Sequence, residues 1–206
     1  MRRLAILRHG RTEWSAVGRM QGRVDHPLSE AGRAEVARWR LPADLAGFAV
    51  TSSPLLRCRE TAALLGPPTL QDGPPILEPR LIEMDWGAWE GQELDDLRRR
   101  HGERMRELEA RGLDFRPPGG ESPREVQARL RPWLQATGAG SADILAITHK
   151  GVIRALYALS SGWDMLGKPP DRLKDAAVHV FCVSADGVPR LERANIWLEP
   201  GGCDAP

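Results

Sequence analysis

Short apolar runs alternate with longer mixed segments along this chain, and the alternation predicts how the chain folds. The runs at 4–7, 48–51 and 144–147 are brief and largely apolar, which is typical of strands buried on both faces of a sheet. The longer segments between them carry apolar residues at helical spacing. Strands separated by helices predict an α/β fold, built on a single doubly wound, mostly parallel sheet with helices on both faces.

Capping and breaking residues locate the first two helices. Ser29 precedes a helical segment that we expect to run through Trp39 and to stop near Pro42. Ser53 offers an N-cap and Pro54 a first helical position for the next helix. The Gly-Pro-Pro break at 66–68 should end that helix.

The second half of the chain carries the same kinds of signal. A capping box at 122–125 opens a further helix, which Pro132 should bend or shorten. The charged segment 93–111 is also helix-prone. The apolar runs 178–183 and 191–197 flank an Asp-Gly dipeptide, which is a typical hairpin turn. We therefore expect one antiparallel edge on the parallel sheet.

The 206 residues fit one compact domain. The chain has no internal repeat, no low-complexity tract and no segment with the composition of a linker. We predict a single domain over 1–200 and a disordered tail at 201–206.

Composition narrows the classes of partner. The formal net charge is only +1, so no overall field favours nucleic acid or a membrane surface. Cys58, Cys182 and Cys203 form no closely spaced pair, which argues against a disulfide scaffold or zinc site and favours a reducing compartment. The apolar start is too short for a signal peptide, and no run is long enough to span a membrane. We predict a cytoplasmic protein without a bound metal or cofactor.

Cationic and imidazole side chains follow the predicted strands. Arg8, His9 and Gly10 come directly after the first strand, Arg57 lies just after the second, and His149 follows a later one. Ligands of open α/β sheets bind outside the carboxyl ends of strands, so these residues should meet at one rim. Phosphoryl oxygens need fixed cationic donors, and nearby arginines keep a nucleophilic imidazole neutral. The glycine should let the backbone approach the phosphate closely.

The ordered motifs of the chain identify a family. They resemble those of the histidine phosphatase superfamily, in its phosphoglycerate mutase-like branch, and they run in family order from residue 4 to about residue 160. The matching segments are Leu7–Trp14, Arg19–Gly22, Asp25–Ser29, Ser53–Ala62, Leu81–Glu83, Gly87–Gly91, Pro118–Ser122 and Thr148–Leu156. The resemblance implies a phosphoglycerate mutase-like fold and phosphoryl transfer through a phosphohistidine.

The resemblance also implies a role for each member of the catalytic set. His9 would accept the phosphoryl group, while Arg8, Arg57 and His149 grip its oxygens. Glu83 would protonate the leaving oxygen and then activate water, since an alkoxide leaves poorly unless a proton arrives with it. Partial burial would raise the pKa of this carboxyl and hold its proton near neutrality.

The motifs name a few further positions. Thr12, Gln21 and Gly22 are candidates for binding phosphate or substrate, although Thr12 and Gln21 are nearly as well suited to stabilising turns. Two positions depart from the family pattern: Ser15 stands where Asn is common, and Lys150 stands where Gly is usual. Lys150 either adds a cation near the phosphate or points away from it, and we favour the second alternative.

Three functions are compatible with these residues. A phosphatase gives the phosphoryl group to water, a mutase returns it to another hydroxyl, and an inactive relative only binds phosphorylated partners. Mutases usually carry Glu-Ser where this chain has Arg11-Thr12, and the segment 92–116 is short for a mutase lid. All catalytic residues are present, which argues against an inactive domain. We predict a metal-independent phosphomonoesterase, with a mutase as the alternative.

The sequence leaves the substrate open. Sugar phosphates, nucleoside-type phosphates such as α-ribazole phosphate, and phosphoglycerates all fit a small-molecule phosphomonoester site. The segments that would select among them, 92–120 and the loop after Gly162, are charged and carry no recognisable motif. The oligomeric state is equally open, and a homodimer is compatible with the sequence.

Overall fold

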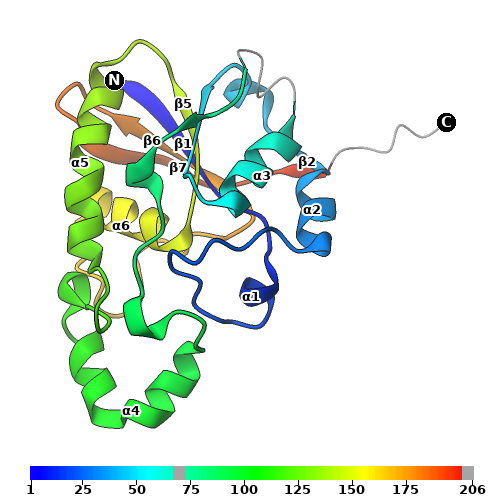
Figure 1. Cartoon of the computed structure of the whole chain (residues 1–206). Helices are drawn as coiled ribbons and strands as arrows, with labels where there is room; N and C mark the ends of the chain where they lie inside the picture. Colours follow the sequence, from blue (N-terminus) through cyan, green and yellow to red (C-terminus); the bar gives the residue numbers. More distant parts are fainter. Residues whose placement is uncertain (67–72, 201–206) are drawn as a thin grey trace.

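A six-stranded mixed sheet forms the centre of the protein. The structure is a computed structural model that describes residues 1–66 and 73–200. The strand order is β4-β3-β5-β1-β6-β7 (Figure 1). The first four strands pair in parallel, while β6 pairs antiparallel with both of its neighbours, β1 and β7. The predicted fold class and the antiparallel edge are therefore confirmed. The strands are β1 (Arg2–Arg8), β3 (Ala49–Ser52), β4 (Ile76–Leu77), β5 (Ile144–Thr148), β6 (Ala177–Val183) and β7 (Pro189–Trp197).

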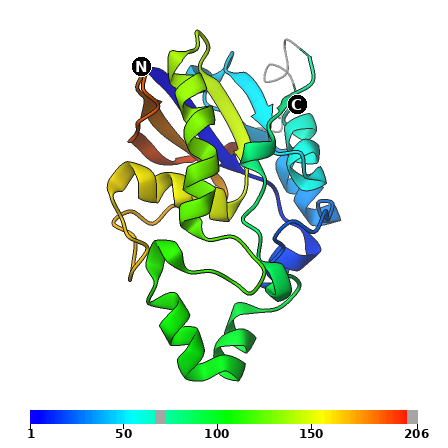
Figure 2. The same cartoon turned by 60° about the vertical axis from the view of Figure 1, so that its left-hand side comes forward.

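Helices cover both faces of this sheet, as Figures 1 and 2 show. α5 (Pro123–Ala139) and α6 (Lys150–Ser161) lie on one face, and α2 (Glu30–Val36) and α3 (Leu56–Leu65) lie on the other. The apolar run of β1 contributes to both cores, because side chains of a strand alternate between faces. Leu4 and Ile6 pack under α5 and α6, while Ala5 and Leu7 pack under α2 and α3.

The helix α4 (Leu94–Glu109) extends away from the sheet at the lower end of the molecule (Figures 1 and 2). Gly102 interrupts it with a φ of 47°, a left-handed conformation that glycine adopts without strain. None of the helices in the described ranges is long and apolar enough to cross a membrane. The remaining elements are short: α1 (Glu13–Ala16), β2 (Trp39–Arg40), β8 (Glu199–Pro200), and 3₁₀ turns at Ala43–Leu45, Pro79–Leu81, Gly87–Trp89 and Gly112–Asp114.

The helix after Ser29 is shorter than predicted. Ser29 caps it as expected, since its hydroxyl accepts a hydrogen bond from the Gly32 amide at 3.0 Å. The helix ends at Val36, and Trp39 belongs to β2, which pairs with β8. This strand pairing joins segments from opposite ends of the chain, so local periodicity could not indicate it.

The predicted start of α3 was also wrong. The helix begins at Leu56 with Leu55 as its N-cap residue, two positions after Pro54. The Ser53 hydroxyl instead lies 2.8 Å from Nε2 of His149. The capping serine of the sequence pattern is therefore part of the site. Gly66 ends the helix as predicted, and the rest of the 66–68 break lies outside the described residues.

The capping box of α5 is confirmed, and the shortening expected of Pro132 is not; the alternative bend stays a prediction. Ser122 and Glu125 exchange the predicted side-chain-to-backbone bonds at the helix start. The helix continues past Pro132 to Ala139, so the proline does not shorten it. Trp133 and Leu134 are buried in the core, and their burial offsets the backbone hydrogen bond that proline cannot make. The predicted tail at 201–206 lies outside the described residues.

Candidate active site

The carboxyl ends of β1 and β5 bring two histidines together. The two strands are parallel neighbours, with Arg8 opposite Thr148, so the residues that follow them emerge side by side. The amide of His9 donates to the Thr148 carbonyl at 3.0 Å, and the ring centroids of His9 and His149 are 5.2 Å apart. Both rings are buried. The convergence expected from strand topology is therefore present.

The surroundings of His9 fix its tautomer and its charge. Its Nδ1 lies 2.7 Å from the Gly10 carbonyl oxygen, which can only accept, so Nδ1 carries the proton and Nε2 keeps its lone pair. Burial lowers the pKa of His9 well below its usual value, and the charges of Arg8 and Arg57 lower it further. The ring is neutral at physiological pH, which is the state that a nucleophilic imidazole requires.

His149 is held in the opposite tautomer. Arg57 donates from Nε to His149 Nδ1 at 3.3 Å, so the proton sits on Nε2 and points to the Ser53 hydroxyl. Burial lowers the pKa of His149 well below its usual value, and Arg57 adds to this effect. The Cys58 thiol lies 3.4 Å from Nε2 of the same ring, and burial raises its own pKa, so it stays protonated. The imidazole is thus a fixed, neutral member of the site.

Arg57 joins α3 to the loop that precedes α2. Its side chain is fully buried and donates to the carbonyls of Val24 and Gly22, each at 2.8 Å. Gly22 has a φ of +51°, and a side chain there would collide with the Glu90 carboxylate. Gly22 therefore holds Arg57 through its carbonyl, and its lack of a side chain lets the loop close.

Arg8 is held at one end and free at the other. Its Nη1 forms an ion pair with Asp175 Oδ2 at 2.7 Å, while its Nε is buried and has no hydrogen-bond partner among the described residues. Lys150 Nζ reaches the same Asp175 oxygen at 3.1 Å. Lys150 is thus linked to Arg8 through a shared carboxylate, and the favoured alternative, that its charge points away from the phosphate, stays a prediction.

Sequence reasoning missed Asp175, which lies in no motif. It comes just before β6, and β6 runs antiparallel to β1. The start of an antiparallel strand lies at the same rim as the ends of its parallel neighbours. Extending the strand-end rule to the starts of antiparallel strands would have drawn attention to this aspartate.

Glu83 lies beside the start of α6. Its Oε1 accepts from the Met84 amide at 2.8 Å and its Oε2 accepts from the Gly151 amide at 3.3 Å. Burial raises the pKa of Glu83 above its usual value, although both amides and the charges of Arg57 and Arg8 oppose the shift. A buried carboxyl of raised pKa can hold a proton at higher pH than an exposed one, as the family resemblance implies for this position.

Gly151 offers a direct probe of this contact. A Cβ at position 151 would lie 2.5 Å from Oε1 of Glu83, so Gly151→Ala must displace the carboxyl. We expect turnover of an alkyl phosphate to fall by roughly tenfold to a hundredfold, the usual effect of misplacing a catalytic group. Thermal unfolding should not show a matching loss, because alanine is the better helix former. Unchanged activity would contradict a role for the Glu83 position.

Thr12 and Gln21 bind each other. The Thr12 hydroxyl, which is fully buried, donates to Gln21 Oε1 at 2.9 Å and accepts from the Ser15 amide at 3.1 Å. The Ser15 hydroxyl completes a capping box at the start of α1. These contacts favour the turn-stabilising alternative for Thr12, and they give Ser15 a local function.

Gly10 has a packing role in addition to the approach to phosphate that stays a prediction. A Cβ there would lie 2.4 Å from Cγ2 of Val36, so the glycine allows α2 to pack against the end of β1. Its amide donates to the Thr61 hydroxyl at 3.0 Å. The close approach that it allows in this structure is therefore between helix and strand.

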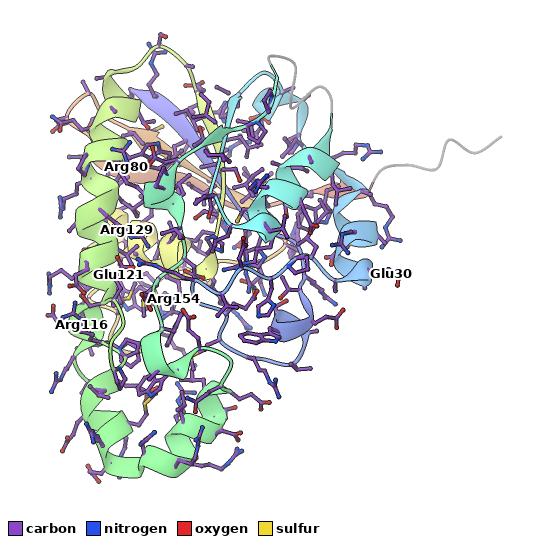
Figure 3. The ribbon with its side chains drawn as sticks, in the orientation of Figure 1. Glu30, Arg80, Arg116, Glu121, Arg129 and Arg154 are labelled. Atoms are coloured by element: carbon purple, nitrogen blue, oxygen red, sulfur yellow. The ribbon has the colours of Figure 1, made fainter. Side chains whose placement is uncertain are left out.

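A network of charged groups supports the segment that carries Glu83. Arg129 donates to the Ile82 carbonyl at 2.7 Å and to the Glu121 carboxylate at 2.9 Å, and Arg23 reaches the Glu83 carbonyl at 3.4 Å. Figure 3 shows Arg129, on α5, close to Glu121, which precedes this helix. Across the described parts of the chain, no group of three or more histidine, cysteine or acidic side chains is placed to hold a metal ion.

Together these groups form a cluster that contains a neutral imidazole, two arginines and a carboxyl of raised pKa, and such a cluster is suited to phosphoryl groups. Comparison with known families agrees. The family model for the histidine phosphatase superfamily (branch 1) matches residues 4–196. The chain belongs to this superfamily, whose members are phosphatases and mutases.

Named relatives fall on both sides of that division. A 2,3-bisphosphoglycerate-dependent phosphoglycerate mutase of Methylobacterium radiotolerans is 34% identical over 194 residues, covering 90% of this chain and 91% of the relative. The mycobacterial glucosyl-3-phosphoglycerate phosphatase has a similar structure, with a TM-score of 0.72 and 30% identity over 96% of this chain and 99% of that one. The protein TTHB049 from Thermus thermophilus is similar too, with a TM-score of 0.70 and 31% identity over 94% of this chain and 99% of that one.

Proposed function

We propose that this protein is a metal-independent phosphomonoesterase that works through a phosphohistidine on His9. The observation that carries the proposal is the fixed tautomer of His9, whose Nδ1 proton is bound by the Gly10 carbonyl and whose Nε2 lone pair is left free. The Nε–H of Arg8, the residue before it, has no hydrogen-bond partner among the described residues and is a donor suited to a phosphoryl oxygen.

In the first step Nε2 of His9 attacks phosphorus and the bond to the leaving oxygen breaks. Protonated Glu83 gives its proton to that oxygen, so an alcohol leaves and a phosphohistidine remains. Arg8, Arg57 and His149 stabilise the charge on the equatorial oxygens.

In the second step water attacks the phosphohistidine. Glu83, now a carboxylate, takes a proton from the water, and inorganic phosphate leaves as His9 regains its neutral form. The carboxyl returns to its protonated state, so each group ends the cycle as it began.

Hydrolysis rather than isomerisation is supported by the first motif and by the middle of the chain. Arg11-Thr12 replaces the Glu-Ser usual in mutases, and α4 with its flanking turns spans only the short segment 92–116. The similarity to a named phosphatase agrees with this proposal, whereas the similarity to named mutases supports the alternative, a phosphoglycerate mutase-type phosphotransferase. A phosphate-binding domain without activity is the third candidate.

One set of assays separates the three functions. The protein is incubated in EDTA with p-nitrophenyl phosphate, and then with 3-phosphoglycerate and a bisphosphate primer, while released phosphate and 2-phosphoglycerate are both measured. We expect release of p-nitrophenol and phosphate in the presence of EDTA. Isomerisation faster than phosphate release would favour the mutase. A protein that turns over neither compound and carries no phosphohistidine after an acid-free quench would be the binding domain.

A further inference from the structure

Asp175 has no role in the proposed reaction, yet its carboxylate holds two cations at the rim of the site. Its Oδ2 pairs with Nη1 of Arg8 at 2.7 Å and with Nζ of Lys150 at 3.1 Å. The Asp175 side chain is 46% exposed, whereas that of Arg8 is 18% exposed. Arg8, His9 and Asp175 line one cavity. The carboxylate therefore reaches from the rim to an arginine that borders the nucleophile.

The ion pair with Asp175 fixes the direction of the Arg8 guanidinium. Arg8 is held at its backbone by β1 and at Nη1 by the carboxylate, and its planar fork leaves Nε between these anchors little freedom. That Nε is buried and has no hydrogen-bond partner among the described residues. An unanchored arginine would lose rotamer freedom when it binds an anion. With Nη1 held, the Nε–H donor is oriented before a phosphoryl group arrives.

Two side chains of the β6–β7 hairpin hold the segment that precedes Asp175. Asn195 accepts from the Lys174 amide at Oδ1, at 2.7 Å, and donates from Nδ2 to the Arg172 carbonyl at 3.1 Å. His179 accepts from the Asn195 amide at Nδ1, at 3.2 Å, so its Nε2 carries the proton and donates to the Lys174 carbonyl at 3.1 Å. We call His179 and Asn195 the clamp.

The backbone at Asn195 is irregular in a way that serves the clamp. Its φ is +57°, a left-handed conformation that asparagine tolerates better than most residues. The register of β6 against β7 shifts at the same place, between the pairs Val178–Ile196 and Val180–Arg193. Bulges of this kind redirect a side chain. Here the Asn195 amide group is directed at the segment that carries Asp175.

We propose that Asp175 is a positioning residue for phosphoryl transfer, which aims Arg8 and is itself held by the clamp. This inference rests on the proposed phosphomonoesterase function. Asp175 acts through Arg8, whose Nε–H donates to a phosphoryl oxygen and stabilises the charge of the transition state. Removal of the carboxylate leaves this donor in the protein but no longer fixes its direction.

A double-mutant cycle tests the inference. We expect Asp175→Ala to lower kcat/KM for p-nitrophenyl phosphate by about tenfold, because Arg8 is no longer aimed. Arg8→Ala should lose more, since the donor itself is absent. If Asp175 acts through Arg8, the double variant should be no less active than Arg8→Ala. Thermal unfolding verifies that each variant is folded.

Two results of the cycle would overturn the proposal. A further loss of about tenfold in the double variant, relative to Arg8→Ala, would show that Asp175 acts independently of Arg8. A higher kcat/KM in Asp175→Ala than in the wild type would show that the carboxylate competes with the phosphoryl group for Arg8.

Other variants separate the partners of Asp175. Asp175→Asn keeps an oxygen that can accept from Arg8, so its loss should be smaller, about threefold. If Asp175→Ala has no effect in a Lys150→Gln background, the carboxylate acts through Lys150 and the assignment to Arg8 is wrong. Asn195→Gly keeps the left-handed backbone and removes both side-chain bonds of the clamp, and it should cost roughly threefold. Unchanged kcat/KM in that variant would contradict the clamp.

Asp44→Ala is the matched control for Asp175→Ala. Asp44 also joins two cations, Arg3 and Arg193, and its side chain is equally exposed at 46%. Arg3 lies near the start of β1, at the opposite end of the strand from Arg8, so kcat/KM should be unchanged. An equal loss in this control would contradict the proposal. Failure of the underlying function looks different, because the wild-type protein itself would then release no p-nitrophenol.

Discussion

Replacing His9 with alanine is expected to lower turnover of p-nitrophenyl phosphate by about 10⁴-fold or more, because the variant lacks the atom that receives the phosphoryl group. The other cationic and imidazole groups of the site cannot substitute for it. The lone pair of His149 Nδ1 accepts from Arg57 and its Nε2 carries the proton, so the ring presents no lone pair to phosphorus, while its Nε2–H remains a donor. The measurement is p-nitrophenol release in EDTA, together with labelled phosphate retained on the protein after an acid-free quench.

His101→Ala is the control for this substitution. His101 is an exposed histidine on α4, so its removal should leave turnover and labelling unchanged. If His9→Ala keeps most of the activity, or retains as much labelled phosphate as the wild type, the assignment of the nucleophile is wrong. The fold of the variant can be verified by its thermal unfolding transition.

Replacing Glu83 with glutamine should affect formation and hydrolysis of the phosphohistidine differently, depending on the leaving group. With an alkyl phosphate we expect a loss of roughly 10²–10⁴-fold, the usual contribution of a general acid. p-Nitrophenolate leaves without a proton, so the first step with p-nitrophenyl phosphate should remain rapid. The second step still lacks its base, and the variant should release one burst of p-nitrophenol and accumulate phosphohistidine.

The pH profile provides an independent readout. Burial raises the pKa of Glu83, so its acid form persists above the usual carboxyl range and is lost as pH rises through the raised value. Wild-type turnover of an alkyl phosphate should fall over that interval, and the limb should be absent in Glu83→Gln. Glu78→Gln is a suitable control, because Glu78 is also buried but its pKa is lowered by Arg80. A limb that survives in Glu83→Gln belongs to another group.

The same shift affects stability. A carboxyl whose folded-state pKa lies above its unfolded value stabilises the fold below the unfolded pKa, and this stabilisation is lost as pH rises through the folded pKa. Glutamine does not ionise, so Glu83→Gln should unfold at a higher temperature than the wild type at neutral pH and lose that advantage in acid. Such a variant would be less active and more stable than the parent.

Much of the fold could be predicted because its signals are local. The run at 4–7 is apolar on both faces, and this pattern indicates a central strand whatever its partners are. The hairpin of β6 and β7 and the capping box at Ser122 are also indicated by residues that are close together in the sequence. The positions of His9 and His149 followed from one topological rule applied to these strands.

The errors arose where contacts distant in sequence decide the outcome. Trp39 lies in a strand because β8, at the other end of the chain, pairs with β2. Ser53 lies beside His149 although its local sequence resembles a helix start. Asp175 belongs to the site because an antiparallel strand starts at the rim, and a lone aspartate in a polar segment carries no local signal. Each case is a tertiary contact that overrides a local preference.

The buried Nε of Arg8 lowers the stability of the fold while it has no hydrogen-bond partner. An unsatisfied buried donor costs on the order of 1–3 kcal/mol, a sizeable share of the net stability of a domain. A chain selected only for persistence of its fold would replace Arg8 with an apolar residue of similar length. A bound phosphoryl group gives this donor its partner, so the loss of Arg8 would be among the first marks of a descendant that no longer handles phosphate.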